Sequence, residues 1–240
     1  MLPTDNRRYL DDLYDKYNRR DLIHPDPLEF LYDYEDSHDR EIVGLIASSL
    51  AYGRVRQILK SVHSILGAMK PSPSTFLDRA SRPLLQSTFS GFKHRFTTGE
   101  EIACLLLGIK GVIERYGTLY ACFTAGMNDD DTVLPAISRF VKELSVERND
   151  RPKSLIPSPI KGSACKRLNL FLRWMVREDG VDPGGWDGVQ VSRLIVPLDT
   201  HMHRISLSLN LTRRKQADMR TALEITDSFR MISPDDPVSH

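Results

Sequence analysis

The chain has 240 residues, a mass of 27.4 kDa and a formal net charge of +1, from 33 Lys and Arg against 32 Asp and Glu. This length allows one large or two small domains with a substantial core, and the near-zero net charge excludes a global field that attracts nucleic acid. No signal peptide opens the chain and no apolar run reaches about 18 residues, so we predict a soluble, cytoplasmic protein without a membrane partner.

The charges are nevertheless segregated along the chain. Residues 26–41 carry seven acidic residues against one basic residue, and residues 151–215 carry twelve basic residues against five acidic ones. Affinity for nucleic acid would therefore come from a local basic patch. The alternative is that both charge runs are solvated faces.

The three cysteines, Cys104, Cys122 and Cys165, are widely spaced and form no CxxC or Cys/His cluster. This spacing argues against a zinc or iron–sulfur site, and we predict neither a metal nor a cofactor. Cys104 and Cys122 lie in apolar helical patterns and are predicted to be core residues.

Apolar residues recur at helical spacing through the first two thirds of the chain, and no stretch alternates with the period of a strand. Gly53 interrupts the pattern, prolines follow Met69, and Gly117 ends a long apolar run. We predict helices capped by Ser37 and running to Leu50, from about Arg54 to Met69, from Thr98 to Gly117, over 118–127, and capped by Asp131 and running to Leu144.

The last third is also helical but is preceded by a proline-containing stretch, residues 147–162, which predicts a linker or long loop. We predict helices over 164–178 with Ser163 as cap, from Asp199 to about Leu209, and from Thr212 to about Met231. The chain as a whole is thus predicted to be one all-α, two-lobed domain over residues 1–240. Its lobe boundary is placed within 147–162, and the cleft between lobes is the default ligand site.

Lys166 opens the helix that follows this linker. With Ser163 as cap, Lys166 would be the third helical residue, where the positive end of the helix dipole and the neighbouring Arg167 both favour a neutral amine. A neutral lysine is a nucleophile that can form a Schiff base with a sugar carbon. The alternative is a solvated basic stripe, or one that contacts phosphates.

Asp199 stands in Pro197-Leu198-Asp199-Thr200-His201, between an apolar run and a helical pattern. A short acidic side chain there is a good helix N-cap, which is the simpler interpretation. Capping also fixes the carboxylate and keeps it ionised, so that it can stabilise an oxocarbenium-like sugar as a base departs.

Several other residues of the basic stretch are candidates for contacts to DNA. His201 and His203 are two apart and point in different directions on a helix, which argues against a shared metal and favours a phosphate, backbone or core role for His201. Stacking on an extruded base is proposed for the indoles of Trp174 and Trp186, with core packing as the alternative. The candidate phosphate contacts are Lys161, Ser163, Arg167, Arg173 and Arg204.

The run from Leu194 to Leu211 resembles the catalytic-aspartate segment of helix-hairpin-helix DNA glycosylases, which typically reads Val-Asp-Thr-His followed by an arginine. The whole chain is similar to a bacterial family of unknown function that shares Ser-Ala-Cys-Lys-Arg, Phe-Leu-Arg-Trp-Met-Val-Arg and Pro-Leu-Asp-Thr-His. The order of lysine and aspartate most resembles archaeal 8-oxoguanine DNA glycosylases. The usual hairpin is absent, and Ile160-Lys161-Gly162-Ser163 is at best its remnant.

The resemblance implies a two-lobed helical fold that binds duplex DNA and receives a flipped base in the interlobe cleft. Asp199 matches the family aspartate and Lys166 the lysine of bifunctional members, while the helix junction with Arg54 would face DNA. It also implies a further helical stretch after His240, so we expect this chain to be a shortened member.

We therefore predict a base-excision glycosylase and AP lyase whose partner is double-stranded DNA with a damaged base, an oxidised purine by analogy. The principal alternative is a non-catalytic, nucleic-acid-binding helical module. A helical interaction protein that docks a basic partner through residues 26–41 is a second alternative. A metal hydrolase using Asp199, His201 and His203 is a third.

Overall fold

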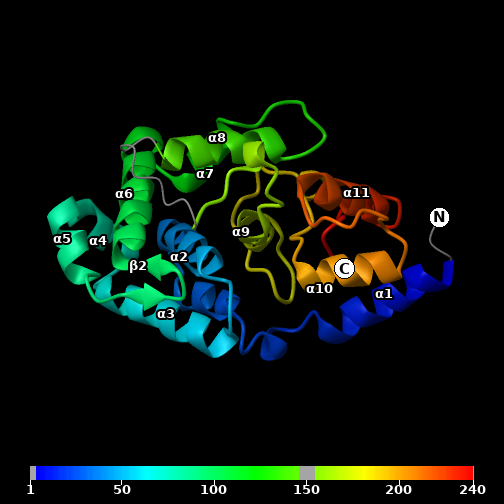
Figure 1. The fold of residues 1–240 in the computed structure, drawn as a ribbon, viewed down its shortest axis with the longest axis horizontal. Helices are drawn as coiled ribbons and strands as arrows, with labels where there is room; N and C mark the ends of the chain where they lie inside the picture. The colour runs from blue at the N-terminus through cyan, green and yellow to red at the C-terminus, as the bar shows by residue number, and fades with distance from the viewer. Residues whose placement is uncertain (1–3, 146–154, 240) are drawn as a thin grey trace. The chain divides into compact units, whose positions relative to one another are not determined.

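The computed structural model of the chain describes residues 4–145 and 155–239 and is mostly helical, with one small β-hairpin (Figure 1). The hairpin pairs β1 (Lys93–His94) with β2 (Thr97–Thr98) in antiparallel register. Short 3-10 helices are η1 (Arg20–Leu22), η2 (Pro27–Asp33), η3 (Pro159–Lys161) and η4 (Val191–Arg193). The α-helices are α1 (Thr4–Tyr17), α2 (Ser37–Ser49), α3 (Val55–Ala68), α4 (Pro73–Arg79), α5 (Arg82–Thr88), α6 (Gly99–Tyr116), α7 (Leu119–Thr124), α8 (Leu134–Leu144), α9 (Lys166–Val176), α10 (Thr200–Ser208) and α11 (Met219–Arg230).

The chain divides into two compact units. Unit 1 is formed by the segment that ends at Ile23, by Asp129–Leu134 and by the chain from Ser158 onward, and unit 2 by His24–Asn128 and the segment from Pro135 to Pro157. Residues 147–154 of the stretch predicted to hold a lobe boundary lie outside the described residues. In the described part of that stretch, the chain passes from unit 2 to unit 1 between Pro157 and Ser158.

The helices with the clearest apolar periodicity are confirmed. Thr98 and Glu101 form a reciprocal capping box at the start of α6, and Gly117 ends that helix with a positive φ of 84°. The Asp199 side chain caps α10 as predicted. These helix ends were predictable because the capping residue and its acceptor geometry are local in sequence.

Three predicted caps were wrong. Asp36 rather than Ser37 caps α2, because its carboxylate accepts from the Asp39 N–H at 3.0 Å. Asp131 does not cap α8, since the Leu134 N–H donates instead to Thr132 Oγ1 at 3.4 Å.

The third wrong cap is Ser163. The N-cap of α9 is Cys165, in the left-handed region with φ 48° and without a side-chain capping bond, so the helix begins at Lys166 and ends at Val176. The last helix also starts later than predicted. It begins at Met219, with Asp218 as its N-cap, rather than after Thr212.

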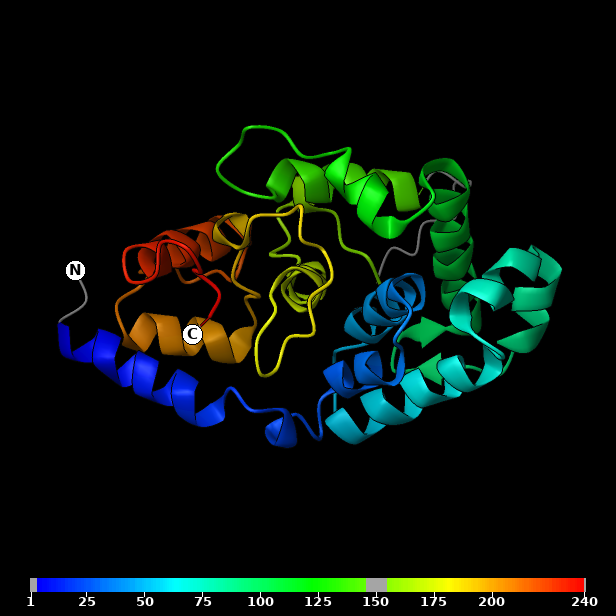
Figure 2. The same ribbon diagram turned by 180° about the vertical axis from the view of Figure 1, so that it is seen from behind.

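The sequence pattern missed α1, α4, α5 and the β-hairpin. Each strand has two residues, which is too short for a period of two to be recognised. Long-range contacts hold the hairpin: Ser61 Oγ lies 2.9 Å from His94 Nδ1, and Tyr52 OH lies 2.6 Å from Thr97 Oγ1. Seen from behind, the hairpin lies beside α3 (Figure 2).

The core of unit 2 is centred on α2, whose residues from Glu41 to Ser49 are all buried. It packs against η2, α3, α4 and α7. Gly108 of α6 allows α8 to approach closely, because a Cβ there would lie 2.3 Å from the carbonyl oxygen of Leu144. Among the described helices of both units, none is sufficiently long and apolar to cross a bilayer.

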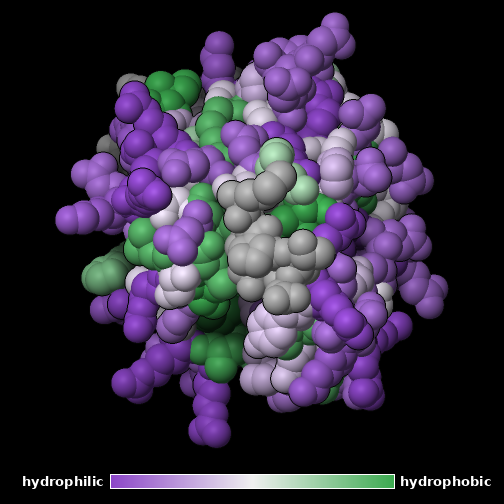
Figure 3. All heavy atoms as spheres, turned by 90° about the vertical axis from the view of Figure 1, so that its right-hand side faces the viewer, coloured by the Kyte–Doolittle hydropathy of each residue, from purple (hydrophilic) through white to green (hydrophobic). Residues whose placement is uncertain are grey.

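The core of unit 1 surrounds α9. The Phe171 ring meets the Trp186 indole edge to face, with centroids 5.2 Å apart, and both are buried. The Gly184 and Trp186 N–H groups donate to the carbonyls of Trp174 and Met175, so the loop after α9 wraps back over the end of that helix. Hydrophilic side chains predominate on the face displayed in Figure 3.

Candidate active site

The structure brings Lys166 and Asp199 together within unit 1. Lys166 Nζ lies 3.3 Å from Asp199 Oδ2, and each side chain is 33 % exposed. The two residues start two different helices, α9 and α10. An amine and a carboxylate from separate helix starts thus form one ion pair that solvent can reach.

Asp199 is fixed by the helix that it caps. Its Oδ1 accepts from the Met202 N–H at 2.8 Å, which leaves Oδ2 for Lys166. Burial by itself would raise the pKa of Asp199, but the hydrogen bond from Met202 and the positive charge of Lys166 outweigh it, so the pKa lies below its usual value. The carboxylate is therefore ionised at neutral pH and held in one orientation.

Two hydrogen bonds order the turn before α9, in which Lys166 is the first helical residue. The Cys165 N–H donates to Ser163 Oγ at 3.2 Å, and Asn169 Nδ2 donates back to the Ala164 carbonyl at 3.0 Å. Burial raises the pKa of the Cys165 thiol to about 11. The thiol beside Lys166 is therefore protonated at neutral pH, so this turn offers no thiolate nucleophile.

The starts of α9 and α11 are also joined. Ser163 forms an isolated antiparallel bridge with Asp218, and the Met219 N–H donates to the Gly162 carbonyl at 3.1 Å. Asp218 in turn accepts from Arg214 Nη2 at 3.0 Å. Sequence reasoning missed this junction, although Asp218 before an apolar helical pattern has the same N-cap signal as Asp199.

The predicted DNA contacts fall into two groups. Lys161, His201 and Arg204 are exposed in unit 1, and Arg167 is partly exposed there. Arg54, the N-cap of α3, is exposed in unit 2. These cations thus lie on solvent-accessible surface of the two units, and their role depends on the ligand.

Three predicted site residues are engaged elsewhere. Arg173 Nε donates to Asp182 Oδ2 at 3.0 Å, so its guanidinium is already paired with a buried carboxylate. Trp174 is 2 % exposed and Trp186 is 1 % exposed. Both indoles therefore pack in the core, which was the alternative to base stacking, and neither face is presented to a ligand.

His203 is buried and lies with its Nε2 2.8 Å from the carbonyl oxygen of Arg214, across the loop between α10 and α11. His201, two residues earlier on α10, is exposed. Among residues 4–145 and 155–239, no three His, Cys, Asp or Glu side chains converge as metal ligands would. The geometry therefore gives no support to a metal hydrolase built on these histidines.

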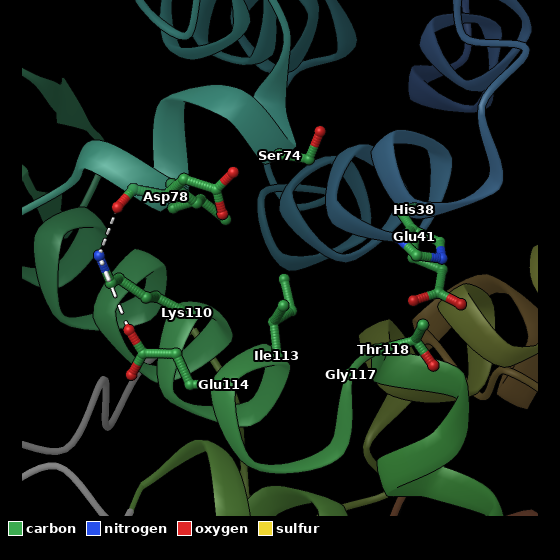
Figure 4. A pocket seen from close by; sticks show the side chains of 10 residues that line it. His38, Glu41, Ser74, Asp78, Lys110, Ile113, Glu114, Gly117 and Thr118 are labelled. Atoms are coloured by element: carbon green, nitrogen blue, oxygen red, sulfur yellow. Dashed lines mark hydrogen bonds and ion pairs between the residues drawn. The ribbon is translucent and has the colours of Figure 1, made fainter.

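Unit 2 contains a separate cavity of about 310 Å³ between α2, α4, α6 and the start of α7 (Figure 4). Glu41 on its wall is 4 % exposed and accepts from the Leu119 N–H at 2.8 Å, so this carboxylate ties α2 to α7. Lys110 on the opposite wall donates to the Asp78 carbonyl at 2.9 Å. These bonds within the wall indicate a structural role, and the cavity contains none of the predicted site residues.

A family model described as "Protein of unknown function (DUF2400)" matches residues 26–240. The chain belongs to the DUF2400 family. Lys166 and Asp199 both lie within the matched part of this DUF2400 chain. No curated protein and no solved structure matches it.

Proposed function

We propose that this DUF2400 chain is a DNA base-excision enzyme, a glycosylase with AP lyase activity that uses Lys166 as nucleophile and Asp199 as stabiliser. The observation that supports it is the 3.3 Å contact between these two side chains, which come from distant parts of the sequence. The resemblance to glycosylases in the segments around both residues supports the same roles.

In the proposed reaction, the Lys166 amine gives up a proton and its Nζ attacks C1′ of the deoxyribose. The bond from C1′ to the base breaks, and the base leaves with the electron pair and takes up a proton. Opening of the sugar ring gives a Schiff base between Nζ and C1′. Loss of a C2′ proton then expels the 3′ phosphate and nicks the strand.

Asp199 has two tasks in this scheme. Its carboxylate stabilises the positive charge that develops on the sugar as the base departs. Its ion pair with Nζ also orients the amine for attack, and because its pKa is lowered the carboxylate stays ionised while the lysine proton goes to solvent water. The hydrogen bond from Met202 keeps this carboxylate in position through both steps.

The proposal includes features that the resemblance implies. These are a two-lobed arrangement with a cleft, a flipped base, and an oxidised purine as the lesion. Exposed cations including Lys161 and Arg204 would contact phosphates and give salt-dependent affinity. The buried Trp174 and Trp186 have no part in base recognition here.

Borohydride trapping on duplexes that carry 8-oxoguanine, uracil or an abasic site tests this proposal. We expect a covalent adduct with the wild-type chain, none with Lys166→Gln, and formation slowed about 100-fold or more in Asp199→Asn. Lys215→Gln, which removes an exposed lysine of the same unit, is the matched control and should trap normally. Equal trapping by wild type and Lys166→Gln would overturn the assignment of the nucleophile.

The second candidate is a nucleic-acid-binding module without catalysis. The cap that Asp199 provides to α10 favours it, because this bond accounts for the aspartate without any reaction. It predicts duplex binding by the wild-type chain, a modest loss of affinity in Lys166→Gln, and no adduct on any of the three duplexes.

A further inference from the structure

We propose that the turn of the β-hairpin in unit 2, Arg95-Phe96, is a finger that inserts into the minor groove of duplex DNA. The proposal rests on the proposed function only in its choice of DNA as partner. It extends the predicted contact at the Arg54 junction to a hairpin that the sequence pattern did not indicate.

The first observation is the exposure of an aromatic ring at the tip of the hairpin. Phe96 is 78 % exposed, whereas its strand neighbours His94 and Thr97 are 2 % and 0 % exposed. The hairpin is therefore anchored by its strand residues and presents one large apolar side chain to solvent. Apolar side chains of this kind insert between base steps in proteins that bind the minor groove.

The second observation is the conformation of Arg95. It has a φ of 52°, in the left-handed region, at the first central position of a two-residue turn, where glycine is preferred. Backbone conformations of this kind concentrate at functional sites. A large cation is thus held where the turn itself would favour a glycine.

The third observation is the placement of the Arg95 side chain. A Cβ on Gly53 would lie 2.8 Å from Arg95 Cδ, so the side chain runs directly over that glycine. Arg95 Cζ also lies 5.5 Å from the centroid of the Phe96 ring. The aromatic ring and the guanidinium therefore form one projection beside the corner between α2 and α3.

The two segments that form this projection carry charges of one sign. Residues 50–61 and 89–98 contain no Asp or Glu, and they carry Arg54, Arg56, Lys60, Lys93 and Arg95. The acidic residues that follow, Glu100 and Glu101, are bonded to Arg82 and to the Thr98 N–H. An exposed aromatic ring within an unbroken group of cations complements a phosphate backbone with accessible bases.

The hydrogen bonds that anchor the β-hairpin are consistent with insertion of the Phe96 side chain between bases. His94 Nε2 lies 3.0 Å from the Tyr52 carbonyl and its Nδ1 lies 2.9 Å from Ser61 Oγ, so the imidazole links the hairpin to both α3 and the corner before it. Tyr52 OH also donates to the His94 carbonyl at 3.0 Å. An inserted side chain can separate stacked bases only if the hairpin that carries it stays in place.

The test measures binding of the full chain to a fluorescein-labelled undamaged duplex at low salt, and the fluorescence of duplexes that carry 2-aminopurine at successive positions. We expect Phe96→Ala to bind about tenfold more weakly and to lose the rise in 2-aminopurine fluorescence that wild type produces. Arg95→Gln should lower the slope of affinity against salt by about one. Met231→Ala, which truncates a side chain that is also 78 % exposed but lies in unit 1, should change neither.

Arg95→Gly separates the two roles that Arg95 can have. A glycine adopts the positive φ without strain, so we expect an unchanged or higher melting temperature together with weaker DNA binding. A lower melting temperature with unchanged DNA affinity would overturn the proposed role and assign Arg95 to packing over Gly53.

The remaining outcomes distinguish the finger from the enzyme. Wild-type affinity and fluorescence in Phe96→Ala, with borohydride trapping intact, would overturn the finger alone. Absence of DNA binding and trapping in the wild-type chain would overturn both proposals. A change in oligomeric state, or in binding to phosphatidylserine vesicles, with no change on DNA would assign the turn to a second copy or to a lipid surface and overturn the proposal.

Discussion

The two ends of α9 carry two ion pairs of different kinds. At its start, Lys166 faces Asp199, and each side chain is 33 % exposed. At its end, the Arg177 side chain is 3 % exposed and contacts the carboxylates of Asp179, Asp182 and Asp236. One helix thus presents a single solvated pair at one end and a buried cluster at the other.

This difference in exposure means that Lys166 can exchange its carboxylate partner for a ligand, whereas Arg177 cannot. Burial opposes the charge of Arg177, but the three carboxylates outweigh it and raise the pKa of its guanidinium. Tyr14 OH also contacts the cluster, at 2.8 Å from Asp179 Oδ2, so α1 is attached there. Lys166 has a solvated partner, so a ligand can replace water beside it without breaking the core.

Removal of the cation at each end should give the largest contrast. We expect Arg177→Met to lower the free energy of unfolding by about 3–5 kcal/mol, because it removes the buried cation that three carboxylates share and leaves Asp182 with Arg173 alone. Lys166→Met is the matched control, and it should cost at most about 1 kcal/mol. Urea denaturation measures both, and equal losses would contradict the distinction between the two ends.

Substitution of Asp199 should have a smaller effect that depends on the replacement. Asn caps helices about as well as Asp, so Asp199→Asn should keep most of the stability, whereas Asp199→Ala should lose about 0.5–2 kcal/mol with its cap. Both variants lack the charge that Lys166 faces. Differential scanning calorimetry gives the comparison, and equal stability of the two variants would show that the cap contributes little.

Acid titration should give the smallest effect. Because the pKa of Asp199 is lowered in the folded chain, its stabilising contribution is present above the usual carboxylate range and is lost as pH falls through the folded value. Wild type should therefore lose more stability between neutral pH and about pH 2–3 than Asp199→Asn does, by less than about 1 kcal/mol. If the free energy of unfolding changed with pH by the same amount in wild type and in Asp199→Asn, this prediction would be wrong.

Residues that act within one turn of the chain were predictable from the sequence, and those that act between turns were not. The cap of α10 by Asp199 and the capping box of α6 follow from local spacing. The start of α9 was misplaced because Ser163 bridges Asp218, more than 50 residues away, instead of capping its own helix. The starts of α2 and α8 were misassigned for a different reason, because a neighbouring polar residue, Asp36 or Thr132, accepts the bond instead of the predicted one.

The same distinction between local and long-range contacts explains which features of the candidate site the sequence predicted. Lys166 and Asp199 were paired because each opens a predicted helix and because both match the glycosylase pattern, and their 3.3 Å contact is a result of the fold. The indoles and Arg173 were assigned to ligand contacts because amphipathic periodicity cannot tell a buried stripe from a binding one. The hairpin was missed because its strands are too short to show a pattern and two of their four residues, His94 and Thr97, bond to Ser61 and Tyr52, which lie outside it.

The burial of the two indoles has a practical consequence. The chain has two tryptophans, Trp174 and Trp186, and both lie in the core of unit 1. Intrinsic tryptophan emission is therefore a spectroscopic label for unit 1 alone, and unit 2 contributes only tyrosine signal. A shift of the emission maximum that precedes or follows the loss of helical circular dichroism would reveal whether the two units unfold as one cooperative block.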